Sequence, residues 1–72
     1  MDRKQAEKTV DEIVKELREI RIAKGISHEK LAHLTGLNRS TISLTESRKS
    51  QPTVLTLILI ADALEADLKE IF

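Results

Sequence analysis

The stretch that decides the fold is residues 27–49, SHEKLAHLTGLNRSTISLTESRK. Ser27 is a preferred N-cap residue, and Gly36 suits the left-handed backbone on which a helix commonly ends. Asn38 is then placed to cap a further helix over residues 39–46. The stretch therefore predicts two short helices joined by a turn too tight for an ordinary helical hairpin.

The helix expected over residues 39–46 has two different faces. Ile42, Thr45 and Glu46 are expected to face the core. Hydroxyl side chains, which are mediocre helix formers, dominate the opposite face, whereas a solvated face more commonly carries Lys and Glu. This outward face is a candidate binding surface, and its residues are Ser40, Ser43, Leu44 and Ser47.

Three further helices and no strand are expected, because helix-forming residues dominate the chain. The first is predicted over residues 5–24 and ends at Gly25. The fourth is predicted over residues 53–64 and is capped by Thr53. The last begins at a capping box of Asp67 and Glu70, and its apolar residues Ile71 and Phe72 are expected to complete the core.

Charge and composition exclude several protein classes. The 12 basic and 12 acidic residues balance, but residues 25–50 hold four basic and two acidic residues, and residues 51–72 hold one basic and four acidic. The middle of the chain would therefore face a polyanion. No apolar run approaches the roughly 18 residues of a membrane span, and there is neither a signal peptide nor a cysteine. We expect a cytoplasmic protein.

No catalytic or metal-binding constellation is present. No nucleophile, base and orienting residue converge, and His28 and His33 are five residues apart, off one helical face. We therefore expect no enzymatic activity, metal, cofactor or small-molecule ligand.

Residues 17–72 resemble the Cro/repressor family of helix-turn-helix proteins, also called the XRE or lambda-repressor-like family. The matching residues are Leu17, Arg21, Gly25, Ile26, Ser27, Leu31, Ala32, Gly36, Arg39, Ser40, Ile42, Ser43, Glu46, Lys49, Pro52, Leu57, Ile60, Ala61, Leu64, Ile71 and Phe72. The resemblance implies an all-α, compact five-helix DNA-binding domain. Residues 1–72 would form this single domain, with residues 28–46 as the helix-turn-helix core and residues 1–12 as an extension of the first helix.

The resemblance also implies roles for individual residues. Base reading falls on Arg39, Ser40 and Leu44, with Ser43 beside them. Arg21 and Glu46 occupy the positions of an ion pair that links the first helix to the recognition helix. Phosphate binding falls on the start of the second helix, the third helix and the loop after it, at His28, Thr41, Ser47, Arg48, Lys49 and Ser50.

Plainer alternatives remain open for these residues. Arg39 suits a bidentate contact to guanine, but it also suits a phosphate contact, and Leu44 either meets a thymine methyl group or packs against a neighbour. Ser40 and Thr41 also suit a solvated helix end. His28, where the family usually has glutamine, either gains charge as the pH falls or has no role.

Three positions depart from the family pattern. Arg48 and Glu65 stand where glycine and a left-handed backbone are usual, and Thr45 replaces a large apolar residue. Each costs about 1 kcal/mol through strain or lost burial. These departures predict a loose end to the third helix and a strained exit from the fourth.

The fourth helix is more apolar than burial on one side requires. Besides its core positions it carries a second apolar face of Val54, Leu55, Ile58 and Leu59. Either a second subunit or residues 1–12 must cover this face. We expect a homodimer with Leu55, Ile58 and Leu59 at its interface.

Two functions remain open. The first is a sequence-specific regulator of transcription that binds double-stranded DNA as a dimer on a palindromic operator. The second is a helix-turn-helix scaffold that binds another protein through the apolar fourth helix, as antitoxin-like or anchoring modules do. Arg39, Arg48 and Lys49 favour the first function, whereas Leu44 and the zero net charge favour the second.

Overall fold

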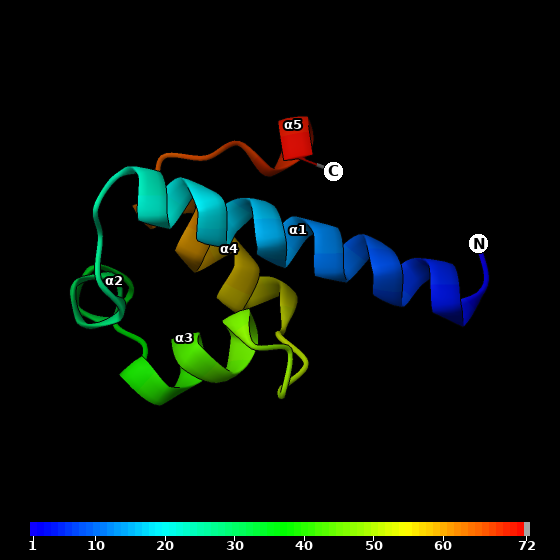
Figure 1. The fold of residues 1–72 in the computed structure, drawn as a ribbon, viewed down its shortest axis with the longest axis horizontal. Helices are drawn as coiled ribbons and strands as arrows, with labels where there is room; N and C mark the ends of the chain where they lie inside the picture. Colours follow the sequence, from blue (N-terminus) through cyan, green and yellow to red (C-terminus); the bar gives the residue numbers. More distant parts are fainter. Residues whose placement is uncertain (72) are drawn as a thin grey trace.

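The computed structural model describes residues 1–71, which form five helices and no strand. Figure 1 shows the helices in chain order, and they are α1 (Arg3–Ala23), α2 (His28–Thr35), α3 (Arg39–Glu46), α4 (Val54–Ala63) and α5 (Leu68–Ile71). The all-α, five-helix fold predicted from the sequence is confirmed. Phe72, expected in the core, lies outside the described residues.

The core lies where α1, α2, α3 and α4 meet. Its most deeply buried side chains are Leu31, Ile42 and Leu64, from α2, α3 and the end of α4. Around them α1 contributes Ile13 and Leu17, and α4 contributes Ile60 and Ala61. Thr45 is also buried, with 3% of its surface exposed. The inward face predicted for α3 is therefore confirmed.

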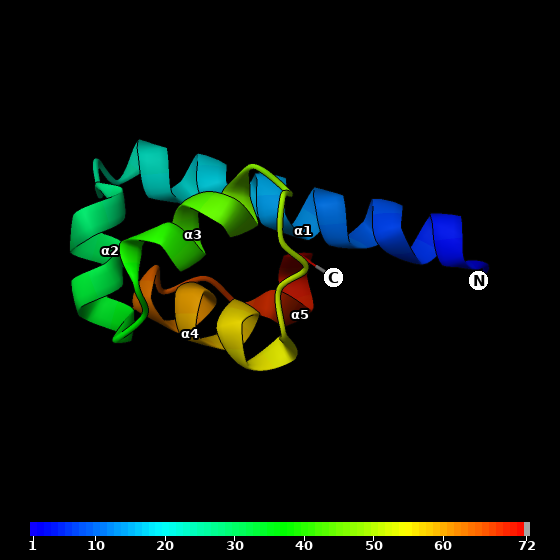
Figure 2. The same cartoon turned by 90° about the horizontal axis from the view of Figure 1, so that it is seen from below.

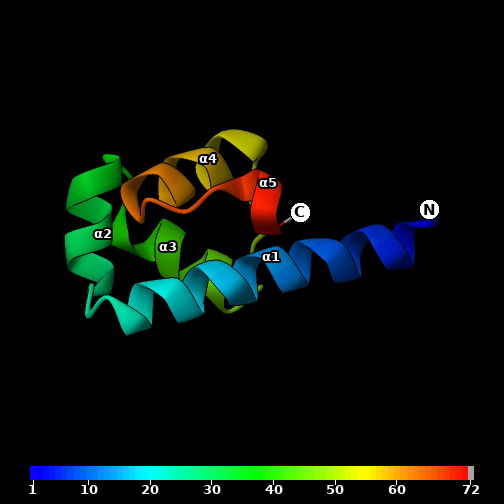
Figure 3. The ribbon, with the colours of Figure 1, turned by 90° about the horizontal axis from the view of Figure 1, so that it is seen from above.

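The first helix begins earlier than the sequence pattern indicated. Asp2 and Gln5 form a reciprocal capping box, in which Asp2 Oδ1 accepts from Gln5 N at 2.8 Å and Gln5 Oε1 accepts from Asp2 N at 3.0 Å. Figures 2 and 3 show that α1 projects as one continuous helix beyond the bundle. The alternative in which residues 1–12 fold across the apolar face of α4 is therefore wrong.

Side-chain caps form at some helix starts and not at others. Ser27 accepts from Lys30 N at 3.0 Å, and Thr53 accepts from Thr56 N at 3.0 Å, as predicted. Asn38 precedes α3, but its side chain makes no cap hydrogen bond. Asp67 Oδ1 accepts from Lys69 N at 2.9 Å, and not from Glu70 N as the expected box requires. Among residues 1–71, the reciprocal bond from Asp67 N to the Glu70 side chain does not form either, so the capping box predicted here is wrong.

Four helices are followed by a left-handed residue. These residues are Gly25, Gly36, Arg48 and Glu65, after α1, α2, α3 and α4, with φ angles of 68°, 75°, 60° and 57°. After α3, Lys49 N donates to Leu44 O at 3.0 Å, and Arg48 N donates to Thr45 O at 3.1 Å. This pair of bonds is a Schellman motif. The left-handed backbone predicted at Arg48 and Glu65 is confirmed, whereas the end of α3 is hydrogen-bonded and not loose as expected.

Candidate nucleic-acid interface

The outer face of α3 is open to solvent. Arg39, Ser40, Ser43, Leu44 and Ser47 are all exposed, whereas Thr41 is half-buried. Leu44 retains 43% of its surface, so it does not pack inside the domain. Because α3 and α5 lie on opposite sides of the bundle, the last helix does not approach this face (Figure 1). The residues expected to read bases are therefore accessible to a duplex.

One carboxylate, that of Glu46, links α1, α2 and α3. Arg21 Nε lies 2.7 Å from Glu46 Oε2, and Arg21 Nη2 lies 3.0 Å from Glu46 Oε1, so the expected ion pair is present in bidentate form. His28 Nε2 lies 2.8 Å from the same Oε1 atom, and Arg21 Nη1 donates to Ile26 O at 2.7 Å. We call Arg21, His28 and Glu46 the Glu46 hub. It fixes the end of α3 against α1.

The Arg21 and Glu46 side chains of the Glu46 hub are largely buried. The partners of Glu46 nevertheless keep its carboxylate ionised. The side chains of Arg21 and Glu46 are 12% and 10% exposed. Burial by itself would raise the pKa of Glu46. Hydrogen bonds from Arg21 and His28, together with the positive charges of these groups, outweigh burial and lower the pKa of Glu46 from its ordinary value of 4.5. The link between the helices is therefore kept at neutral pH.

We expect this lowered pKa to make folding stability depend on pH in the acid range. Because the pKa of Glu46 is lower in the folded chain than in the unfolded chain, its contribution is fully present above the ordinary value of 4.5. It is lost as the pH falls through the lowered folded value. Urea unfolding between about pH 7 and pH 3 measures the loss. A Glu46→Gln variant should lack this part of the pH dependence, and identical profiles would contradict the expectation.

Two residues expected to bind phosphate are already bound to carboxylates of the chain. His28 belongs to the Glu46 hub and is 27% exposed. The Arg48 guanidinium pairs with Asp11 of α1, and its Nη2 atom donates to Gln51 Oε1 at 3.0 Å. A phosphate must therefore compete with these carboxylates. Sequence reasoning missed Asp11, because it lies 37 positions from Arg48.

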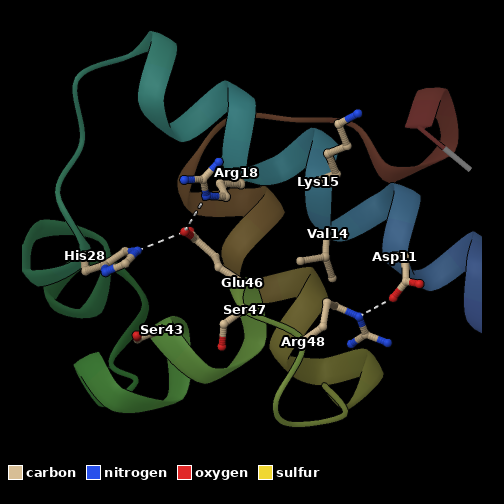
Figure 4. Close-up of a pocket in the computed structure, with 9 residues that line it drawn as sticks. All are labelled: Asp11, Val14, Lys15, Arg18, His28, Ser43, Glu46, Ser47 and Arg48. Carbon is tan, nitrogen blue, oxygen red and sulfur yellow. Dashed lines mark hydrogen bonds and ion pairs between the residues drawn. The ribbon is translucent and has the colours of Figure 1, made fainter.

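A groove of about 510 Å³ runs between α1 and α3. Figure 4 shows Arg18 and His28 pointing to Glu46, and Arg48 pointing to Asp11. Lys15 points away from α3 at the rim of the groove (Figure 4). The lining residues are Asp11, Val14, Lys15, Arg18, His28, Ser43, Glu46, Ser47 and Arg48. Exposed hydroxyl groups of α3 thus share this groove with basic side chains of α1, which the sequence analysis did not assign to any site.

The rest of the described chain shows no metal cluster. Within residues 1–71, no group of three His, Cys, Asp or Glu residues is arranged to hold a metal ion. His33 is exposed on α2. No helix in this part of the chain has the length and apolar character needed to cross a membrane.

Comparison with known proteins identifies the family. A family model described as helix-turn-helix matches residues 17–71, which are 55 of the 72 residues. The chain belongs to the XRE-type helix-turn-helix family. As a member of this family it is a DNA-binding transcription regulator and not an enzyme. No curated protein matches its sequence.

Two solved structures resemble this XRE-type helix-turn-helix protein over most of its length. One is the restriction-modification controller protein C.AhdI from Aeromonas hydrophila, at 35% sequence identity and a TM-score of 0.77, covering 88% of this chain and 96% of that chain. The other is a point mutant of the restriction-modification controller protein C.Esp1396I, at 30% identity and a TM-score of 0.80, covering 89% of this chain and 83% of that chain. The family resemblance inferred from the sequence is thereby confirmed.

Proposed function

We propose that the protein is a sequence-specific regulator that binds double-stranded DNA as a homodimer on a palindromic operator. The observation that carries this proposal is the exposed face of α3, which begins at Arg39. Within residues 1–71, Arg39 takes part in no ion pair. Its guanidinium donors are therefore available for guanine O6 and N7, and Ser40, Ser43 and Leu44 lie along the same face.

Contacts to the DNA backbone are expected to position α3. Ser47, Lys49 and Ser50 are exposed at the end of α3 and in the loop that follows. These residues can bind phosphate directly, whereas His28 and Arg48 do so in competition with Glu46 and Asp11. Phosphate contacts set the register of a protein on a duplex without selecting its sequence.

The apolar face of α4 supports the homodimer. Val54, Leu55 and Ile58 are 71%, 65% and 48% exposed, and α1 points elsewhere. Leu59 is half-buried at the margin of this face. A second copy of α4, related by a two-fold axis, would cover the face with matching residues. Two α3 helices would then meet half-sites about one helical turn, or roughly 34 Å, apart.

The likeness to two restriction-modification controller proteins suggests a biological role. C.AhdI and C.Esp1396I share 35% and 30% of their sequences with this chain, and each structure covers nearly all of it. We infer that the protein regulates genes of a restriction-modification system. Upstream regions of such genes are the first sequences in which to look for its operator.

Selection of bound duplexes from a random pool tests the proposed function. We expect a recovered motif with two-fold symmetry. The Arg39→Ala variant should bind the recovered duplex about 5- to 150-fold more weakly per half-site, because a bidentate arginine–guanine contact is worth about 1–3 kcal/mol. Lys69→Ala is the matched control, because it removes one positive charge from α5 on the opposite side of the bundle.

Three outcomes would contradict parts of this proposal. An asymmetric motif would exclude the two-fold dimer, and unchanged affinity of Arg39→Ala would exclude base reading by that residue. Failure to select any duplex would favour the alternative function, a scaffold that binds another protein through α4.

A further inference from the structure

The backbone at Arg48 is strained, and glycine would relieve the strain. Arg48 has a φ angle of 60°, in the left-handed region that is unfavourable for a residue with a side chain and open to glycine. Strained residues persist where the surrounding structure holds them, and they gather at functional sites. The presence of an arginine here therefore indicates a role for its side chain.

All three nitrogen atoms of the Arg48 guanidinium have acceptors. Arg48 Nε donates to Asp11 Oδ1 of α1. Arg48 Nη2 donates to Gln51 Oε1 at 3.0 Å, and Nη1 makes a longer contact of 3.5 Å with Ser50 O. The side chain is only 23% exposed, and Figure 4 shows it directed at Asp11. Arg48 thus ties the chain after α3 to α1.

The backbone holds only the first part of the segment that follows α3. We call residues 47–51 the exit loop. Ser50 N donates to Leu44 O at 3.3 Å, which continues the bonds of the Schellman motif. Gln51 N donates no hydrogen bond within residues 1–71. The Arg48 side chain therefore supplies the contacts that fix the second part of the exit loop.

The exit loop lies beside the proposed DNA-binding face. Lys49 and Ser50 are exposed in it and are expected to bind phosphate. Within residues 1–71, Lys49 takes part in no ion pair, so its charge is available to a ligand. Asp11 precedes residues 17–71, which match the family model. The tie from Asp11 to the exit loop is therefore made by the additional turns at the start of α1.

We propose that Arg48 is a positioning residue, which together with Asp11 holds the exit loop so that Lys49 and Ser50 meet the sugar-phosphate backbone of duplex DNA. This proposal rests on the proposed function, because α3 must place the domain on the duplex. Arg48 keeps its bond to Asp11 in the complex, since a guanidinium with three acceptors gains little by exchanging one of them for a phosphate. The exit loop is then ordered before DNA binds, and less conformational entropy is lost on binding.

The test is the affinity of an Asp11→Ala variant for the selected operator, measured over a range of salt concentrations. We expect binding about 2- to 12-fold weaker per half-site, which is the cost of ordering one flexible side chain at an interface. This loss should occur although the variant gains a positive net charge. If Arg48 instead binds phosphate in competition with Asp11, its release should raise the affinity and make the slope of log K against log salt steeper by about 0.9 per subunit.

Glu12→Ala is the matched control, because Glu12 is exposed on α1 and takes part in no ion pair within residues 1–71. It makes the same change in net charge as Asp11→Ala and should bind at least as tightly as the parent. Urea unfolding of both variants should resemble that of the parent, because ion pairs near the surface contribute little to stability. The weaker binding of Asp11→Ala would then report the position of the exit loop and not a loss of folding.

A charge exchange tests the pair directly. Arg48→Asp should bind weakly, and aspartate tolerates the left-handed backbone. Adding Asp11→Arg restores both the net charge and the pair, so most of the lost affinity should return. Arg48→Asp with Glu12→Arg has the same net charge without the pair and should remain weak. A phosphate ligand at position 48 could not be replaced by aspartate, so recovery in the exchanged pair alone indicates positioning.

The outcomes separate this proposal from the proposed function. If Asp11→Ala binds as tightly as the parent or more tightly, while Arg39→Ala binds weakly, the positioning role is overturned and the proposed function stands. The positioning role is also overturned if the exchanged pair binds as weakly as Arg48→Asp alone. If the parent selects no duplex, both proposals fail.

Discussion

Replacement of Glu46 by glutamine should remove a large part of the stability of the fold. The expected loss is about 3–5 kcal/mol, because Arg21 would remain largely buried without a charged partner. Domains of this size have a total stability of roughly 4–11 kcal/mol. Urea unfolding at neutral pH, followed by circular dichroism, measures the change.

Two further variants test whether the loss of stability in Glu46→Gln comes from leaving Arg21 without a charged partner. Glu19→Gln removes an exposed carboxylate from the outer side of α1, and it should change stability by no more than about 0.5 kcal/mol. Arg21→Met combined with Glu46→Leu should recover part of the loss, because no unpaired charge is left inside. If Glu46→Gln unfolds at the same urea concentration as Glu19→Gln, the Glu46 hub does not stabilise the fold.

Replacement of Leu55 and Ile58 by lysine should convert the proposed homodimer into a soluble monomer. Operator affinity should fall by about 100-fold or more, because the two half-sites are no longer bound by one linked unit. Ile58 is chosen because it is 48% exposed, whereas Leu59 is half-buried. Added lysines increase the attraction to DNA, so a loss of affinity would report the lost dimer. Sedimentation measures the change in mass.

Ile22→Lys is the matched control for the dimer variant. Ile22 is 51% exposed near the end of α1, away from the apolar face of α4. We expect this variant to sediment like the parent. If the parent is already monomeric at tens of micromolar, the homodimer proposal is wrong.

Local signals were sufficient to predict the two central helices. Ser27 and Gly36 act within one turn of their own positions, so both ends of α2 could be placed from the sequence. The start of α1 was misplaced because the capping box of Asp2 and Gln5 precedes every apolar residue of its stripe. Asn38 lies at the N-cap position of α3, but its side chain makes no cap hydrogen bond. The residue type at a cap position therefore does not determine the side-chain rotamer.

Contacts between distant residues were predictable only where the family resemblance supplied them. The pair of Arg21 and Glu46 was expected for that reason, although 25 positions separate the two residues. His28 with Glu46, and Asp11 with Arg48, depend on how α1 lies against the rest of the fold, which helix periodicity does not specify. Two side chains assigned to phosphate were therefore found bound to carboxylates.

The Glu46 hub has a consequence for selectivity. Because one carboxylate joins three helices, we expect α3 to move little towards substitute hydrogen bonds when the proposed operator contains a mismatched base pair. A donor that finds no acceptor at the mismatched base pair makes no hydrogen bond, so the mismatch keeps its full cost in binding free energy. Little conformational entropy would be lost when α3 binds DNA, because the Glu46 hub already holds the helix in place. Under the proposed function, discrimination between operators would then be prepared in the free protein, by a carboxylate on the inner side of α3.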